Sequence, residues 1–486
     1  MEKKNVVDLH LLPDHQKGAK IYRDTTSQIV NETPSLWFSK RFLVATVLFL
    51  CFVNFQVLRN NINIIVVEMT SNRTYKEGNS TFVKPPDFNW DQTTIGLIIS
   101  ILAYGGLFSI FGDVAINKLG GSVTCAWCML IAGIMTILHP AILQIDFSLF
   151  LACRFLTGIF EMFFYVSTSD IFSRWFPKKE RSTLISYSFN GTNIGVAGVY
   201  PFCGYLAYKW GWQVAFYITG IISVLSAILC LILVKNQPSD DKWISKKELA
   251  YILEETDRST KMKVNHPFWS IVTSGPVWSL CIVTFVFMWV ASVLNACLPL
   301  YIKDLTQKDT DEIGLISSIP NIVFLVLFPI NGALMDYWKN HSNITVTGVH
   351  RIIMSIAFFF ASVMFVVSGL TSNVNATLIF FVLIQIPMSF LPIIIQVLPI
   401  NLAPDHVSVV AGMSTCAFSL SAIAAQTITG YMTEHHSEQE WNNCFYLAAV
   451  ISVFGAIVFV LWGSSELQPW ASKPPAKEER VLYEIN

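Results

Sequence analysis

Three charged side chains stand within apolar stretches of the sequence, where an ionised group is costly. Arg59 lies late in one stretch, and Arg154 and Glu161 share another. An Arg at the centre of a membrane span costs about 2.5–3.5 kcal/mol on insertion scales, so each one requires a functional reason. Two buried cations near one titratable carboxylate predict a cavity that attracts an anion and exchanges a proton.

The spacing of Arg154 and Glu161 predicts that they share one face of a helix. Seven residues correspond to about 10.5 Å of rise and almost two turns, and Tyr165 continues the same face. This separation is too long for a direct bond within one helix, so pairing requires partners elsewhere. Burial and nearby arginines act in opposite senses on a carboxylate pKa, which suits Glu161 to proton coupling. We expect Arg59, Arg154 and Tyr165 to bind the substrate.

Neutral polar residues accompany these charges. Asn61 follows Arg59 closely, and Asn190 lies in a later apolar run with Gly191 and Gly195. We expect Asn61 and Asn190 to line the cavity and to bind the substrate, although for Asn190 a hydrogen bond between helices is an equally good explanation. The two glycines have the spacing of tight helix packing.

The composition indicates which elements must position these residues. Of 486 residues, 53% are apolar and 13% are charged, about half the ~25% charged residues usual in soluble proteins. The net charge of −1 excludes a basic nucleic-acid-binding surface. At about 20 apolar residues per span, the chain predicts an all-α membrane protein with twelve helices. These lie near 42–67, 95–116, 123–143, 147–170, 184–207, 214–235, 277–301, 312–334, 350–370, 376–399, 406–429 and 442–463.

A single long hydrophilic interruption separates six spans from six. The predicted division is a tail at 1–41, a six-helix bundle at 42–235, a central loop at 236–275, a second bundle at 276–463 and a tail at 464–486. With both termini in the cytosol, 24 Lys and Arg fall inside and six outside, which favours this orientation. The tails and the central loop are then cytosolic.

The predicted orientation assigns two kinds of surface signal. The sequons at Asn72, Asn79 and Asn375 fall on outer loops, where glycosylation is expected. Asp8 with Leu11 and Leu12 forms an acidic dileucine pattern in the cytosolic tail, which predicts a sorting adaptor as a partner.

Two loops suggest that the halves are repeats. Asp113-Val-Ala-Ile-Asn117-Lys118-Leu-Gly120 and Gly332-Ala-Leu-Met-Asp336-Tyr-Trp-Lys339 occupy equivalent places in the two halves. Both resemble degenerate forms of the G-x-x-x-D-[RK]-x-G loop signature of major-facilitator transporters, in which two six-helix bundles surround a central cavity. The resemblance implies a cytosolic gate. We assign Asn117, Lys118, Arg181 and Asp336 to it.

No metal site or enzyme is predicted. Cys125-x-x-Cys128 has no second pair, so a zinc site is not expected, and no nucleophile–base motif is visible. The only expected cofactor is a coupling ion, H+ or Na+.

Over residues 40–472 the chain resembles the anion transporters comprising sialin, the vesicular glutamate transporters and the type I sodium–phosphate cotransporters. The resemblance is carried by Arg59-Asn60-Asn61-Ile62 with Glu68-Met69, Phe88-Asn89-Trp90, Arg154-x-x-x-Gly158-x-x-Glu161-x-x-x-Tyr165, Ser173-Arg174-Trp175, Gly211-Trp212, Leu402-Ala403-Pro404 and Glu466-Leu467-Gln468-Pro469-Trp470-Ala471. It implies that Arg59 and Arg154 handle the anion and that Glu161 couples transport to protons.

Departures from the family pattern bear on the substrate. Glutamate-transporting members have His where Ile99 stands and Arg where Phe287 stands, and Met162 and Val166 replace a family Gly and Pro. These changes disfavour a dedicated glutamate carrier.

The sequence therefore predicts a secondary active transporter of small organic or inorganic anions, working by alternating access and coupled to protons. Sodium–phosphate cotransport, potential-driven carriage of organic anions, and a transport-inactive anion sensor on the same fold remain alternatives. A small anion and the lipid bilayer are the expected partners, with no nucleic acid. The expected location is a lysosomal, vesicular or plasma membrane.

Overall fold

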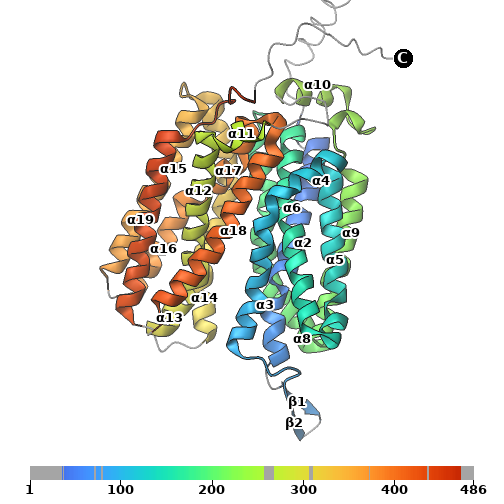
Figure 1. The fold of residues 1–486 in the computed structure, drawn as a ribbon, viewed down its shortest axis with the longest axis vertical. Helices are drawn as coiled ribbons and strands as arrows, with labels where there is room; N and C mark the ends of the chain where they lie inside the picture. The colour runs from blue at the N-terminus through green and yellow to red at the C-terminus, as the bar shows by residue number, and fades with distance from the viewer. Residues whose placement is uncertain are drawn as a thin grey trace, which may run out of the picture.

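The computed structural model describes residues 35–36, 38–70, 73–77, 80–256, 267–305, 310–371, 373–434 and 437–471. Its long helices form two groups that stand side by side with their axes roughly parallel (Figure 1). The first group runs from α2 to α9 and the second from α12 to α19. Most hydrophobic side chains at the helix contacts are fully buried, while many on the outer faces are exposed, as a lipid environment requires.

The first half follows the predicted order of spans. It comprises α2 (Lys40–Thr70), then α3 (Gln92–Gly105), η2 (Gly106–Phe111) and α4 (Gly112–Leu119) in one run, α5 (Gly121–Ile145), α6 (Phe147–Trp175), α7 (Arg181–Phe189), α8 (Gly191–Trp210) and α9 (Trp212–Leu233). Gly120 and Gly211 precede α5 and α9 with φ of 86° and 96°, values that only glycine adopts at little cost. They turn the chain sharply between consecutive spans.

The linker and the second half complete the chain. The linker carries η3 (Pro238–Asp240), α10 (Lys246–Glu255) and α11 (Phe268–Val272). The second half comprises α12 (Gly275–Ser292), the π-helical turn η4 (Val293–Cys297), α13 (Leu298–Leu305), α14 (Thr310–His341), α15 (Val346–Gly369), α16 (Val374–Met388), α17 (Leu391–Leu402), η5 (Pro404–His406), α18 (Val407–Met432) and α19 (Glu438–Trp462).

Eleven helical segments in the described part of the chain are long and apolar enough to cross a membrane. The span predicted at 184–207 is instead divided into α7 and α8 at Asn190. Its serine, threonine and asparagine residues lower its hydropathy. The predicted tight packing at Gly191 and Gly195 is confirmed, because an added Cβ would lie 2.2 Å from the Phe49 carbonyl oxygen and 2.4 Å from that of Val53.

A short hairpin between α2 and α3 was not predicted from the sequence. Strands β1 (Arg73–Glu77) and β2 (Ser80–Lys84) pair antiparallel, with Arg73 opposite Lys84. Their threonine and aromatic content favours strands. The hairpin and the linker helix α10 project from opposite ends of the molecule, which we call the hairpin end and the linker end (Figure 1).

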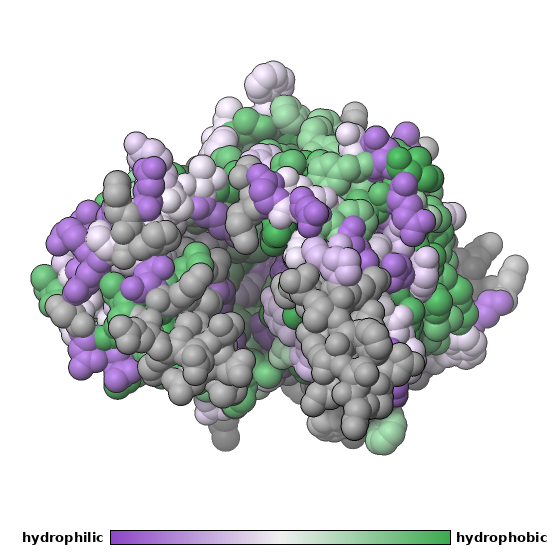
Figure 2. Space-filling view, turned by 90° about the horizontal axis from the view of Figure 1, so that it is seen from below, coloured by the Kyte–Doolittle hydropathy of each residue, from purple (hydrophilic) through white to green (hydrophobic). Residues whose placement is uncertain are grey.

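The two halves meet closely toward the linker end. There α7 packs on α14, and α18 packs along η2, α4 and α6. The approach leaves little space, since a Cβ on Gly332 would lie 1.8 Å from Ser186 Oγ. Viewed from the hairpin end, by contrast, the surface is hollowed between the halves (Figure 2). The molecule is thus sealed at the linker end and hollow at the hairpin end.

Candidate functional site

An ion pair between two helices of the first half forms the centre of the candidate site. Arg59 Nη1 in α2 donates to Glu161 Oε1 in α6. The Glu161 side chain is 1% exposed, whereas that of Arg59 is 23% exposed, so the guanidinium is the more accessible partner. Glu161 therefore finds on another helix the partner that the sequence spacing required.

The second oxygen of this carboxylate has no such partner. Glu161 Oε2 is buried and accepts no hydrogen bond from any residue that the structure describes. A carboxylate oxygen in this position is costly to bury unless the group is paired or protonated. The pair with Arg59 offsets this cost only in part, because it satisfies one of the two carboxylate oxygens.

Arg154 lies deeper in the same half. It is 1% exposed, and its Nε donates to the Ile98 carbonyl oxygen of α3 at 3.1 Å. Among the described residues this is its single hydrogen bond, so its terminal N–H groups have no protein acceptor there. A guanidinium held in this way presents unused donors in the fork geometry that suits a carboxylate or phosphate.

Glycines bring α3 close enough for this contact. An added Cβ on Gly158, one turn after Arg154, would lie 2.1 Å from the Leu102 carbonyl oxygen. One on Gly105 of α3 would lie 2.5 Å from the Phe155 carbonyl oxygen of α6. The helices therefore cross backbone against backbone. This places the Ile98 carbonyl within reach of Arg154 Nε.

The other predicted binding residues occupy different environments. Tyr165 is half-buried, with Phe52, Phe164 and Phe189 packed around its ring at centroid distances of 5.6, 5.6 and 6.1 Å. Asn61 is fully buried and donates to Thr219 Oγ1 of α9 at 3.3 Å, so it joins two helices. The half-buried Asn190 accepts a hydrogen bond from Asn193 Nδ2 at 3.0 Å.

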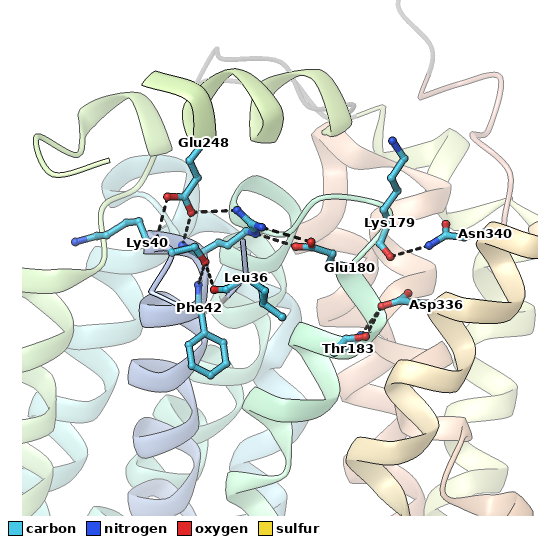
Figure 3. Close-up of polar contacts among 11 residues, drawn as sticks. Leu36, Lys40, Phe42, Lys179, Glu180, Thr183, Glu248, Asp336 and Asn340 are labelled. Atoms are coloured by element: carbon cyan, nitrogen blue, oxygen red, sulfur yellow. Dashed lines mark hydrogen bonds and ion pairs between the residues drawn. The ribbon is translucent and has the colours of Figure 1, made fainter. Parts of the chain in front are cut away.

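Residues predicted for the cytosolic gate join the two halves at the linker end (Figure 3). The Asp336 carboxylate of α14 accepts hydrogen bonds from the backbone N–H groups of Ser182 and Thr183 at 3.1 and 2.6 Å, and from the Thr183 hydroxyl at 2.8 Å. Lys339 pairs with Asp336 at 3.0 Å and donates to Ser182 Oγ. The carboxylate thereby caps the first turn of α7 from the opposite half.

Arg181 and Asn117 also lie at this interface. Arg181 Nη1 donates to Asn401 Oδ1 of α17 at 3.0 Å. Asn117 Nδ2 donates at 2.9 Å to Asp113, whose other oxygen accepts from the Ser408 hydroxyl of α18. Asp113 was not among the residues predicted for the gate, although its acidity was a visible signal. Lys118 is exposed at the end of α4.

The linker helix α10 binds the start of α2 next to these contacts (Figure 3). Glu248 accepts the backbone N–H groups of Lys40 and Arg41 at 3.0 and 2.9 Å, which caps α2. The fully buried Arg41 guanidinium contacts Glu248 at 3.4 Å and Glu180 at 2.8 Å, and lies 5.2 Å from the centre of the Tyr251 ring. The central loop thus binds the first half through buried charges.

The predicted surface signals lie partly beyond the described residues. Asn72, Asn79, Leu11 and Leu12 fall outside them. Asn375 is exposed in the first turn of α16, while Thr377 of the same sequon is fully buried and accepts from the Tyr301 hydroxyl at 3.3 Å. The side chain at Asn375 remains reachable from the hairpin end.

Comparison with known proteins shows which transporters this chain is similar to in sequence. A sequence profile of the Major Facilitator Superfamily matches residues 44–370 and 280–484. The chain is 26% identical over 451 residues to vesicular glutamate transporter 2.2 of Danio rerio, covering 91% of this chain and 77% of that one. It is 25% identical over 474 residues to vesicular glutamate transporter 1 of Xenopus laevis, covering 96% and 82%. These similarities confirm the resemblance to anion transporters seen in the sequence.

Solved structures share the fold. The proton:xylose symporter XylE bound to 6-bromo-6-deoxy-D-glucose aligns with a TM-score of 0.64 at 14% identity, covering 88% of this chain and 97% of that one. The transporter FucP in the outward conformation aligns with a TM-score of 0.62 at 13% identity, covering 86% and 99%. Together with the sequence profile they confirm the predicted major-facilitator fold.

Proposed function

The chain belongs to the Major Facilitator Superfamily, and from this premise we propose that it is a proton-coupled transporter of small organic or inorganic anions. The observation that carries the proposal is the charge pattern in the first half. Arg59 and Arg154 contribute two positive charges, and Glu161 compensates only one of them. A buried excess cation with unused N–H donors is a site for an anion.

Anion binding is coupled to proton uptake because Arg59 exchanges one partner, Glu161, for the anion. An anion that reaches Arg59 competes with Glu161 for the guanidinium. Once displaced, Glu161 is a buried carboxylate without a cation, which is several kcal/mol less favourable than its neutral form. It therefore takes up a proton as the anion binds. Anion and proton then travel together, and the excess charge of the site changes little during the cycle.

The two ends of the molecule support alternating access. A hollow lies at the hairpin end (Figure 2). Arg59 stands in the half of α2 that leads to the hairpin, and its side chain is the more exposed member of the ion pair. At the linker end Asp336 joins the halves. In the opposite state the halves part at Asp336 and close at the hairpin end. The excess of Lys and Arg on linker-side loops favours the cytosol for that end.

Names of relatives suggest which anions and membranes to test first. The relatives named vesicular glutamate transporters support an organic anion and a vesicular membrane for this chain. The phenylalanine at 287 and isoleucine at 99 still disfavour glutamate itself. Sialate, aspartate, urate and phosphate therefore accompany glutamate in the panel.

Uptake into proteoliposomes tests the proposal. Gradients of pH, sodium and voltage are imposed one at a time on purified wild-type protein. We expect accumulation of at least one anion under a pH gradient, and its loss in Glu161→Gln while exchange of anion across the membrane continues. Glu254→Gln, an exposed acid on α10, is the matched control.

Three results would contradict the proposal. Sodium-driven or voltage-driven accumulation that Glu161→Gln leaves unchanged would remove proton coupling through this residue. Binding without flux under every gradient would indicate an anion sensor. Accumulation of neutral sugars in place of all anions would remove the anion assignment.

A further inference from the structure

A histidine in α5 has no role in the mechanism above. His139 is 2% exposed, and neither Nδ1 nor Nε2 has a hydrogen-bond partner among the described residues. Two rings enclose it edge-to-face, those of Phe150 at 5.2 Å and Phe216 at 5.6 Å between centroids. Buried polar atoms in folded proteins nearly always have a partner, and an unpartnered pair of nitrogens points to an unseen occupant such as water.

Other polar groups lie on the neighbouring turns of α5 and α6. The Phe150 ring that contacts the imidazole stands one turn before Arg154 on α6, and the terminal N–H groups of Arg154 also lack a protein acceptor in the described structure. Pro140 follows His139 inside α5 and supplies no N–H to the Thr136 carbonyl, four residues before it. A buried water needs two to four polar partners. The ring nitrogen, the guanidinium and this carbonyl stand on adjacent turns of two packed helices and are polar groups of the kind that such a water requires.

We propose that His139 is a positioning residue for Arg154, acting through a buried water that bridges the imidazole and the guanidinium. The water accepts an N–H of Arg154 and donates to the unprotonated ring nitrogen, and its second O–H faces the Thr136 carbonyl. Arg154 is then held at two points, by Ile98 through Nε and by the water through a terminal nitrogen. Its remaining N–H groups are directed to the anion. This role rests on the proposed function.

A purely structural histidine in this position would behave differently. Its two unpaired nitrogens give no packing advantage over a phenylalanine of similar shape between Phe150 and Phe216. Replacing unpaired buried polar atoms by apolar ones is neutral or stabilising. His139→Phe is therefore expected to fold and to melt at or above the wild-type temperature. Any loss of anion affinity in that variant then reports on Arg154.

Kinetics of uptake provide the first arm of the test. We expect His139→Phe to raise KM for the transported anion about tenfold or more while kcat changes by less than about twofold, because one hydrogen bond to a charged group is lost. His139→Gln restores a polar atom and should recover most of the affinity. A His139→Phe protein with wild-type KM would overturn the proposal.

The second arm detects the water without transport. In hydroxyl-radical footprinting by X-ray pulse and mass spectrometry, side chains beside a bound water are oxidised even when buried. Phe150 and Phe216 should be oxidised in wild type and protected in His139→Phe, with the fully buried Phe365 of the second half protected in both. Equal protection of all three in wild type would overturn the proposal. If wild-type protein transported no anion, the proposed function would fail, while this arm would still decide whether the water exists.

Discussion

The carboxylate of Asp336 accepts both the backbone N–H and the hydroxyl of Thr183, at 2.6 and 2.8 Å. The two residues belong to opposite halves of the transporter. Glu180, the N-cap residue that precedes α7, makes no capping hydrogen bond with its side chain. The first turn of α7 therefore depends on the other half for its cap, and the gate is closed by helix-end hydrogen bonds as well as by charge.

Weakening this cap should shift the equilibrium between the two access states. Asp336→Asn removes the charge and leaves one acceptor oxygen for Lys339 and the three donors of α7. Hydrogen bonds to a charged group are worth about 1.5–3 kcal/mol, so the ratio of gate-closed to gate-open molecules should fall about tenfold or more. Distances between spin labels at exposed Lys178 and His341 measure it. The exposed Asp240→Asn is the control, and an unchanged distance distribution in Asp336→Asn would contradict the role of the cap.

The crossing of α3 and α6 should not tolerate a methyl group. In Gly158→Ala the new Cβ would meet the Leu102 carbonyl at 2.1 Å, so the helices must separate and the bond from Arg154 to Ile98 is lost. We expect destabilisation of about 1–3 kcal/mol and weaker anion binding. Gly198 has no atom within 4 Å of an added Cβ, so Gly198→Ala should be neutral or slightly stabilising. Thermal unfolding followed by tryptophan fluorescence compares them, and equal melting temperatures would refute the clash.

Arg154 should require its guanidinium as well as its charge. Arg154→Ala should abolish anion binding. Arg154→Lys keeps the charge but loses the fork and the Nε donor, and should raise KM about tenfold or more. Arg351→Lys is the matched control, because Arg351 also donates to a backbone carbonyl, that of Gly463, far from the site. Normal uptake by Arg154→Ala would remove Arg154 from the binding site.

Docking of α10 should weaken at high pH through Tyr251. Burial, together with the negative charges of Glu180 and Glu255, raises the pKa of the Tyr251 phenol above its ordinary value. The unfolded chain loses this proton near pH 10 while the folded protein retains it. Stability is therefore at its full value below about pH 10 and falls as the pH rises further.

Melting temperatures of wild type and Tyr251→Phe measure this effect. The Phe variant should lose part of the decline above about pH 10. Tyr208→Phe, in which an exposed tyrosine is replaced, should follow wild type. Parallel profiles for wild type and Tyr251→Phe would show that the phenol makes no contribution.

Much of the architecture follows from the sequence, because bilayer thickness and hydropathy determine the number and order of spans. The exception at Asn190 has a physical cause, since Ser186, Ser188 and Asn190 form hydrogen bonds within the protein. The charges at Arg59, Arg154 and Glu161 were recognised because an ionised group in an apolar run is rare.

The interaction partners of these charged residues could not be predicted from the sequence. That Glu161 pairs with Arg59 depends on how α2 packs against α6, and that Arg154 bonds to Ile98 depends on a backbone carbonyl, which every residue has. Asn61 was expected at the cavity, and the bond of its amide to Thr219 of α9 could not be predicted. The partner of a short side-chain amide such as that of Asn61 depends on which helices pack around it.

Because Asp336 caps α7 from the other half, the exchange of single backbone amides reports how often the two halves separate. The N–H groups of Ser182 and Thr183 are protected from deuterium exchange by an acceptor on the other half. They become exchangeable only when the halves part at the linker end. Their exchange rates therefore count the excursions to the opposite state in the absence of any substrate, and a transported anion that speeds the cycle must speed the exchange of these two amides as well.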